Sequence, residues 1–370
     1  MTPSIRSLEL RQASEDASLE NLLRLSMRYK GQVFEKEILE KCFNPFFTKR
    51  PNFSGLDFKR EVRKSLGFYP SHEMLRLLKQ WNEIAPTNKK IDSQRLTEPY
   101  KQNLRGGLKR FMGVVNRSSF LHYAFDQKWK KEVAELISKY DGLKGFGTDS
   151  HTIFIGFIQE ERREYNFLEK IDLYISKIYQ ITHRKAILLS KIKKLRAHLS
   201  NYLGTAFELM VVGPWVLKGY VEDYEPIIPS SGKRAEALVN VDGFKFLLEA
   251  TTSQTGRALD QGGAFDPRDS AKSIASKLFS KVEQLKQMDL PIFIFYNPHV
   301  GTFEEEVKMG IDDFLETPNA AWVLGVAVAY DYRAPKLEVF ENAKFRPPKN
   351  LMQILEKVYP ISALKDGNLK

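Results

Sequence analysis

Three glutamates in the second half of the chain stand where apolar side chains would be expected. Glu208 lies in the apolar stretch GTAFELMVVGPWVLKGY, while Glu236 and Glu249 lie in two short apolar runs of GKRAEALVNVDGFKFLLEATTSQ. A carboxylate surrounded by Phe, Leu and Val loses hydration unless a positive partner meets it, and neighbouring carboxylates add repulsion. A divalent cation resolves both problems, and Mg²⁺ prefers carboxylate and water oxygens. These residues therefore predict a metal site that handles phosphates.

The elements expected around these glutamates can bring them together. Asp242-Gly243 is a strong signal for a tight hairpin turn, and it joins a strand over 235–241 to a strand over 244–251. Side chains alternate along a strand, so Lys245, Leu247, Glu249 and Thr251 share one face of the second strand. Glu236 falls near the outer end of the first strand. A helix over about 203–218 carries Glu208, so helix and hairpin together can form one acidic pocket.

Helices and strands alternate from residue 201 onward. A helix is expected over 269–287, strands over 291–297 and within 320–332, a further strand over 336–342 and a last helix over about 349–358. Nearly continuous apolar strands interleaved with amphipathic helices are typical of a sheet that is covered on both faces. The expected fold class is α+β overall: a mostly helical N-terminal region, then an α/β core with a central mixed sheet.

The order of the acidic residues resembles a known family. A helix carboxylate, a strand carboxylate and a carboxylate on the next strand, over about 203–332, look like the αβββαβ core of the PD-(D/E)xK nuclease superfamily, the restriction-endonuclease-like fold. The resemblance implies that Glu236, Glu249 and the Ala250 carbonyl hold Mg²⁺ or Mn²⁺, aided by Glu208. It also implies hydrolysis of phosphodiester bonds, with Glu249-Ala250-Thr251 in the place of the family's Asp/Glu-x-Lys.

The signature departs from the family pattern in three places. Ala235 stands for proline, Glu236 for aspartate and Thr251 for the signature lysine. That lysine places a cation beside the attacking water and the reacting phosphate, whereas a threonine hydroxyl can orient water but supplies no charge. Thr251 is therefore a candidate catalytic residue with a reduced role.

Other residues could replace the missing lysine. Lys277 and Lys281 lie one helical turn apart on the helix after the hairpin, and Lys277 is slightly favoured. Lys245 shares a strand face with Glu249, and Gln254 follows Thr251 by three residues.

The positive charge of the chain is unevenly distributed. The net charge is +11, and residues 101–200 alone hold 20 Lys and Arg against 10 Asp and Glu. A polyanionic partner is the simplest explanation, which favours nucleic acid, DNA more than RNA. Residues 1–145 are expected to form a basic helical domain, 146–202 a long helical connector and 203–370 the nuclease-like domain. Residues 55–81 could form a small helix-turn-helix or winged-helix unit, or belong to a plain helical bundle.

Composition excludes several classes of function. The single cysteine, Cys42, can form neither an internal disulfide nor a thiolate zinc cluster, and the six histidines show no metal-ligand spacing. No phosphate-cradling glycine loop is present. No run is long enough to span a membrane, and the N-terminal stretch lacks a signal-peptide core, so we expect a cytoplasmic protein.

The sequence thus favours a metal-dependent endonuclease, of the kind found in restriction, mobile elements or phage defence. An alternative keeps the fold and drops the chemistry, because without the signature lysine the domain could bind nucleic acid or a partner protein and cut nothing. A third reading, an unrelated α/β enzyme acting on a small anion, lacks a supporting motif. A homodimer is expected by analogy alone.

Overall fold

The computed structural model describes residues 93–140, 152–159, 161–196, 199–228, 232–253, 267–285, 289–298, 302–331, 336–345 and 350–367, with single positions at 79, 82, 83, 87, 90 and 333. Cys42, Gln254 and, apart from Lys79, the helix-turn-helix expected over 55–81 lie outside the described residues. Internal contacts divide the chain into two units. One comprises Met1–Arg110 with Lys128–Thr148, and the other comprises Phe111–Gln127 with Asp149–Lys370. From Asp149 onward, the expected connector belongs to the second unit.

The described part of the first unit is helical, as the sequence predicts. It contains most of α6 (Ser93–Arg117) and α7 (Gln127–Lys139). The rings of Tyr100 and Tyr140 lie 5.2 Å apart, and the Lys101 ammonium donates a hydrogen bond to the Ser138 carbonyl at 2.8 Å. These contacts fasten the start of α6 to the end of α7.

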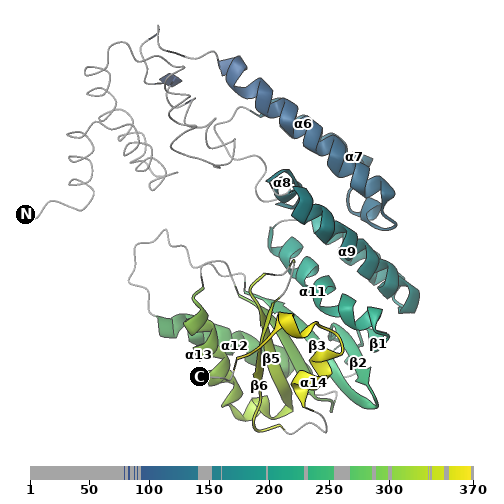
Figure 1. Ribbon diagram of the computed structural model, residues 1–370, viewed down its shortest axis with the longest axis vertical. Helices are drawn as coiled ribbons and strands as arrows, with labels where there is room; N and C mark the ends of the chain where they lie inside the picture. Colours follow the sequence, from purple (N-terminus) through teal and green to yellow (C-terminus); the bar gives the residue numbers. More distant parts are fainter. Residues whose placement is uncertain are drawn as a thin grey trace, which may run out of the picture. The chain divides into compact units, whose positions relative to one another are not determined.

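A series of helices precedes the sheet in the second unit. They are the short 3-10 helix η2 (Leu121–Tyr123), α8 (Thr152–Gln159), α9 (Glu161–Ile181), α10 (Lys185–Lys193), η3 (Lys194–Arg196) and α11 (Leu199–Leu217). Helices α9 and α11 lie side by side (Figure 1), because Gly213 of α11 leaves room for the ring of Tyr174 on α9. Helix α11 corresponds to the helix that the sequence predicts over about 203–218, and it begins four residues earlier.

Seven strands among the described residues form one mixed sheet. They are β1 (Val221–Tyr224), β2 (Ala237–Val241), β3 (Phe244–Thr252), β4 (Ile292–Asn297), β5 (Val323–Ala329), β6 (Leu337–Glu341) and β7 (Leu364–Asp366). Their order across the sheet is the order of the chain. The pairs β1–β2, β2–β3 and β5–β6 are antiparallel, whereas β3–β4, β4–β5 and β6–β7 are parallel. A mixed sheet is thus confirmed.

The predicted hairpin is present. Asp242 and Gly243 both have positive φ, 51° and 87°, and the register pairs Val241 with Phe244 across them. This is the backbone conformation that makes Asp-Gly a preferred hairpin turn. It fixes which face of β3 carries Glu249.

Helices cover both faces of the sheet (Figure 1). On one face, α12 (Pro267–Leu285) and α13 (Glu304–Leu315) bury a core with β3, β4 and β5 that includes Leu247, Ile294 and Leu278. On the other face, Trp215 of α11 meets Phe246 edge-on at 5.6 Å. Tyr359, which follows α14 (Leu351–Glu356), packs on the same side. None of the described helices has the length and hydropathy needed to cross a bilayer.

Candidate metal centre

Two backbone hydrogen bonds bring three acidic residues to one end of the β2–β3 hairpin. The Glu225 N–H donates to the Glu236 carbonyl at 3.0 Å, and the Glu236 N–H donates to the Leu248 carbonyl at 3.1 Å. Glu225 directly follows β1, Glu236 lies in a bend before β2, and Leu248 precedes Glu249 on β3. The main chain therefore places Glu225, Glu236 and Glu249 in neighbouring positions before any side chain is considered.

Glu225 adopts an uncommon backbone conformation. Its φ is +54°, in the left-handed region, where side chains other than those of Asn and Asp are rare. Such strain persists where surrounding contacts determine the conformation, and it concentrates at functional sites. Here the hydrogen bond to Glu236 and the burial of the Glu225 side chain hold it in place.

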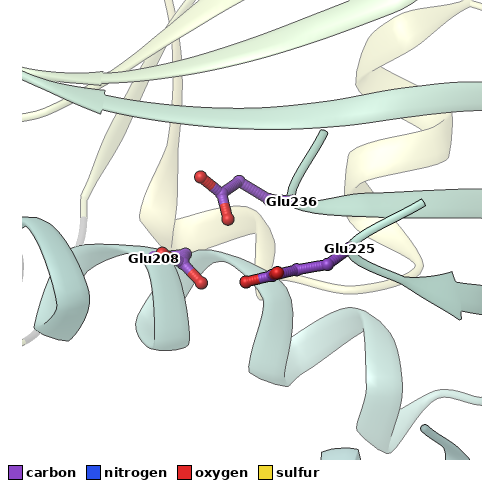
Figure 2. Close-up of side chains that lie close together, drawn as sticks. All are labelled: Glu208, Glu225 and Glu236. Atoms are coloured by element: carbon purple, nitrogen blue, oxygen red, sulfur yellow. The ribbon is translucent and has the colours of Figure 1, made fainter. Parts of the chain in front are cut away.

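Glu208 reaches the same pocket from α11. Its side chain is buried, and the Tyr224 hydroxyl donates a hydrogen bond to it at 3.0 Å. One carboxylate oxygen from each of Glu208, Glu225 and Glu236 lies within 4.8 Å of the others. Figure 2 shows these three carboxylates directed toward one another. Among the described residues, they form a group whose oxygens could share a cation.

A lysine from α10 already contacts this group. The Lys191 ammonium forms ion pairs with Glu208, with Glu225 and, at 3.0 Å, with Glu236. Arg234 adds a longer ion pair to Glu225 at 3.3 Å, and its side chain is partly exposed. Two cationic side chains, Lys191 from α10 and Arg234 from the segment before β2, therefore contact the cluster.

The protonation of the cluster follows from burial and charge. Burial, and next the Glu236 charge, raise the pKa of Glu208 well above its ordinary value. Burial opposes ionisation of Glu236 too, but Lys191 outweighs it and lowers the pKa of Glu236. Burial would lower the pKa of Lys191, yet Glu236 and Glu208 raise it well above its ordinary value. Glu236 and Lys191 therefore form the charged pair, whereas the raised pKa of Glu208 favours its protonated form.

Glu249, the third predicted glutamate, lies beside the group of Glu208, Glu225 and Glu236, on the face of β3 that meets α12. It is 1% exposed, and the Lys281 ammonium lies 2.5 Å from one of its oxygens. Burial, and then the negative charge of Glu236, raise the pKa of Glu249 to about 7, against the opposing effect of Lys281. Glu249 is therefore electrostatically joined to Glu236, although it lies outside the tighter group of three.

Two further predicted residues, Ala250 and Thr251, follow Glu249 on β3. Thr251 is buried on β3, two residues beyond Glu249. The register pairs β3 with β2 only as far as Leu248, so the backbone around Ala250 pairs with β4 and faces the bend at Glu236 on its other edge. The Ala250 carbonyl thus remains a candidate ligand.

The three lysines that could replace the signature lysine have different partners. Lys281 contacts Glu249, whereas Lys277 donates a hydrogen bond to the Thr252 carbonyl. Lys245 instead pairs with Glu222 at 2.7 Å and is half-exposed. The cation beside Glu249 is therefore Lys281, and not Lys277, which the sequence slightly favours.

Two members of the cluster were not found from the sequence. Glu225 lies in VEDYEPIIP, a polar connection without the apolar surroundings that mark Glu208 and Glu249. Lys191 lies in the basic run KIKKLRAHL, where a lysine buried at an acidic pocket looks like any surface lysine.

Comparisons of the chain with family models, with curated proteins and with solved structures gave no match.

Proposed function

We propose that this protein is a metal-dependent nuclease that hydrolyses phosphodiester bonds, DNA more readily than RNA. The observation that carries the proposal is the convergence of Glu208, Glu225, Glu236 and Glu249 at one end of the β2–β3 hairpin. Buried carboxylates repel one another and lose hydration, so a fold that gathers four of them requires cations at that place. Lys191 and Lys281 supply two.

The order of elements supports the same proposal. Helix α11, strands β1 to β3, helix α12 and strand β4 follow the αβββαβ order that the resemblance implies. The first three strands pair antiparallel and the fourth joins parallel to β3. Glu208, Glu236 and Glu249 lie on the first helix, before the second strand and on the third, as in the family's pattern.

The donor set fits Mg²⁺ or Mn²⁺. Glu208, Glu225 and Glu236 offer hard oxygen ligands within 4.8 Å of one another, and Glu249 lies outside this group. We assign the ion to Glu208, Glu236, Glu249 and the Ala250 carbonyl, with Glu225 as an added ligand. A bound ion supplies Lewis-acid activation of the scissile phosphate and of its own water ligand.

The chain's own residues have distinct roles in this proposal. Lys281 places positive charge beside Glu249 and takes the part of the signature lysine that Thr251 cannot fill. The buried Thr251 hydroxyl orients water, and Lys277 fixes the end of β3 through the Thr252 carbonyl. Lys191 neutralises the carboxylates while no metal is bound.

A second candidate function is supported by the same lysine. Lys191 contacts all three carboxylates of the tighter group, and Thr251 replaces the signature lysine. In this alternative the cluster is a structural ion network, and the domain binds nucleic acid or a partner protein without cutting. Binding would still weaken with added salt, because residues 101–200 carry 20 basic against 10 acidic side chains.

The experiment that separates the two is a cleavage assay with supercoiled plasmid and with labelled DNA and RNA oligonucleotides, in Mg²⁺ or Mn²⁺. We expect the wild type to cut and Glu249→Gln to lose about a hundredfold or more in rate, because the variant removes a charged ligand of the proposed ion. Glu305→Gln, at an exposed glutamate on α13, is the matched control and should cut like the wild type. A wild type that binds but never cuts, or a Glu249→Gln variant that cuts normally, would overturn the nuclease proposal.

A further inference from the structure

A group of aromatic rings lies near the surface of the second unit, outside the acidic site. Phe120 contacts Tyr123 at 6.2 Å and Tyr179 of α9 at 4.9 Å, and His122 contacts Tyr123 at 4.2 Å between ring centroids. The Lys185 ammonium lies 4.6 Å from the centre of the Tyr179 ring. We call Phe120, His122, Tyr123, Tyr179 and Lys185 the aromatic patch.

The backbone holds these rings in place. The N–H groups of Ser119 and Phe120 both donate to the Asp172 carboxylate of α9, each at 2.8 Å. The next residue, Leu121, is fully buried. The rings are therefore preorganised, and a ligand that stacks on them does not need to order the loop.

The patch exposes surface that stacking would bury. The Tyr123 side chain is 40% exposed, and His122 and Lys185 are also exposed. Leu173 and Ile181, near the patch in sequence along α9, are similarly exposed. Exposed rings beside cations are the features with which proteins bind single-stranded nucleic acid, because each base has a face to stack and each phosphate a charge to pair.

The segment that carries Tyr179 and Lys185 has charge of one sign. Residues 173–207 contain no Asp or Glu, but they contain seven Lys and Arg. The acidic side chains that flank the loop are already engaged: Asp172 with the two backbone N–H groups, and Asp126 with Arg196 at 3.2 Å. A polyanion therefore meets no uncompensated negative charge in this segment.

The patch is physically connected to the acidic site. Arg184, beside Lys185, bonds to Asp223 at 2.6 Å and to the Tyr224 carbonyl at 2.8 Å, and Glu225 follows Tyr224. Lys185 begins α10, and Lys191 on the same helix contacts the glutamates. Six residues of helix rise about 9 Å, so Lys185 and Lys191 lie about 9 Å apart along the axis of α10.

We propose that the aromatic patch binds single-stranded nucleic acid, with a base stacked on Tyr123 and a phosphate at Lys185. This inference rests on the proposed function and refines it: the substrate has an unpaired segment next to the scissile bond. A duplex offers its phosphates but keeps its base faces stacked, so it would use the cations of the patch and leave the rings unused.

The test is fluorescence anisotropy with the full chain in EDTA, where no cleavage occurs, using labelled oligo-dT, oligo-U and a DNA duplex. Stacking on one base is worth about 1–3 kcal/mol. We therefore expect Tyr123→Ala to weaken binding of both single strands about tenfold, with Tyr123→Phe close to the wild type and duplex binding little changed. Lys185→Gln should make the salt dependence of binding shallower by about one phosphate contact.

Two matched controls lie outside the patch, at the residues that directly precede β5 and β6. Trp322→Ala removes a ring that is also 40% exposed, and Lys336→Gln removes an exposed cation next to β6. Both should bind oligonucleotides like the wild type. Equal affinity of Tyr123→Ala and Trp322→Ala for single strands would overturn the proposal, provided that melting temperatures show both variants folded.

Binding and cleavage separate this proposal from the proposed function. If the wild type never cuts but Tyr123→Ala loses binding to single strands, the patch proposal is supported and the nuclease proposal is rejected. If the wild type cuts and Tyr123→Ala binds single strands normally, only the patch proposal is rejected.

Discussion

Lys281 of α12 places its ammonium nitrogen 2.5 Å from a carboxylate oxygen of Glu249 on β3. If this cation does the work of the signature lysine, Lys281→Met should lower the single-turnover cleavage rate about a hundredfold or more at saturating Mg²⁺. Lys277→Met, which removes a bond to a backbone carbonyl, should cost much less. The opposite ranking of the two variants would assign the role to Lys277.

Glu225 should contribute to metal affinity although no family pattern points to it. Its carboxylate belongs to the group of three, so we expect Glu225→Gln to weaken Mg²⁺ binding about 10- to 100-fold, measured by titration calorimetry. Glu222→Gln is the control, since Glu222 lies on β1 and pairs with Lys245 near the surface. Identical affinities for the two variants would remove Glu225 from the site.

Glu249 makes the stability of the metal-free protein depend on pH. Its folded pKa of about 7 is above the ordinary value of 4.5, so its contribution to stability is complete below pH 4.5 and is lost as pH rises through 7. Glu249→Gln keeps the shape of the side chain without the charge. The free energy of unfolding of this variant, relative to that of the wild type, should therefore increase from pH 5 to pH 8. The gain is on the order of 3 kcal/mol, from the shift of the pKa. Urea unfolding in EDTA measures it, and a constant difference across this range would contradict the assignment.

Lys191 should matter most when no metal is bound. Lys191→Met leaves three buried carboxylates without their shared cation, which costs on the order of 3–5 kcal/mol. The loss should shrink as pH falls and Glu208 and its neighbours take up protons, and Mg²⁺ should raise the melting temperature of this variant more than that of the wild type. Lys193→Met, at an exposed position of the same helix, is the control. A variant as stable as the control at pH 8 in EDTA would show that Lys191 is not needed there.

Gly213 and Gly204 test how α11 is held against α9. A Cβ at Gly213 would overlap the Tyr174 ring, whereas a Cβ at Gly204 would have no heavy atom within 4 Å. Gly213→Ala should lower stability by about 1–3 kcal/mol despite the better helix propensity of alanine. Gly204→Ala should raise it by up to about 1 kcal/mol. Thermal unfolding compares the two, and similar changes would mean that the ring moves aside freely.

Local signals predicted much of the fold and part of the site. Asp242-Gly243 specifies a turn through its own backbone preferences, and the apolar runs before and after it specify β2 and β3. The burial of Glu249 follows from its apolar neighbours in the same strand.

The remainder depends on contacts between residues far apart in sequence. Lys191 is 45 residues from Glu236, and only the packing of the helices before β1 decides that it enters the pocket. The choice between Lys277 and Lys281 depends on the angle of α12 over β3, which helical spacing does not fix. Glu225 depends on a left-handed backbone that its residue type does not suggest.

The strands of the sheet follow one another in the order in which a ribosome makes them. A nascent chain that has emerged as far as Thr252 already contains α10, α11 and the first three strands, with all four glutamates and Lys191. Lys281 and the last four strands come later. Of the two lysines that contact the glutamates, Lys191 is therefore made before the hairpin and Lys281 after it, so Lys191 is the first counter-ion available to the pocket.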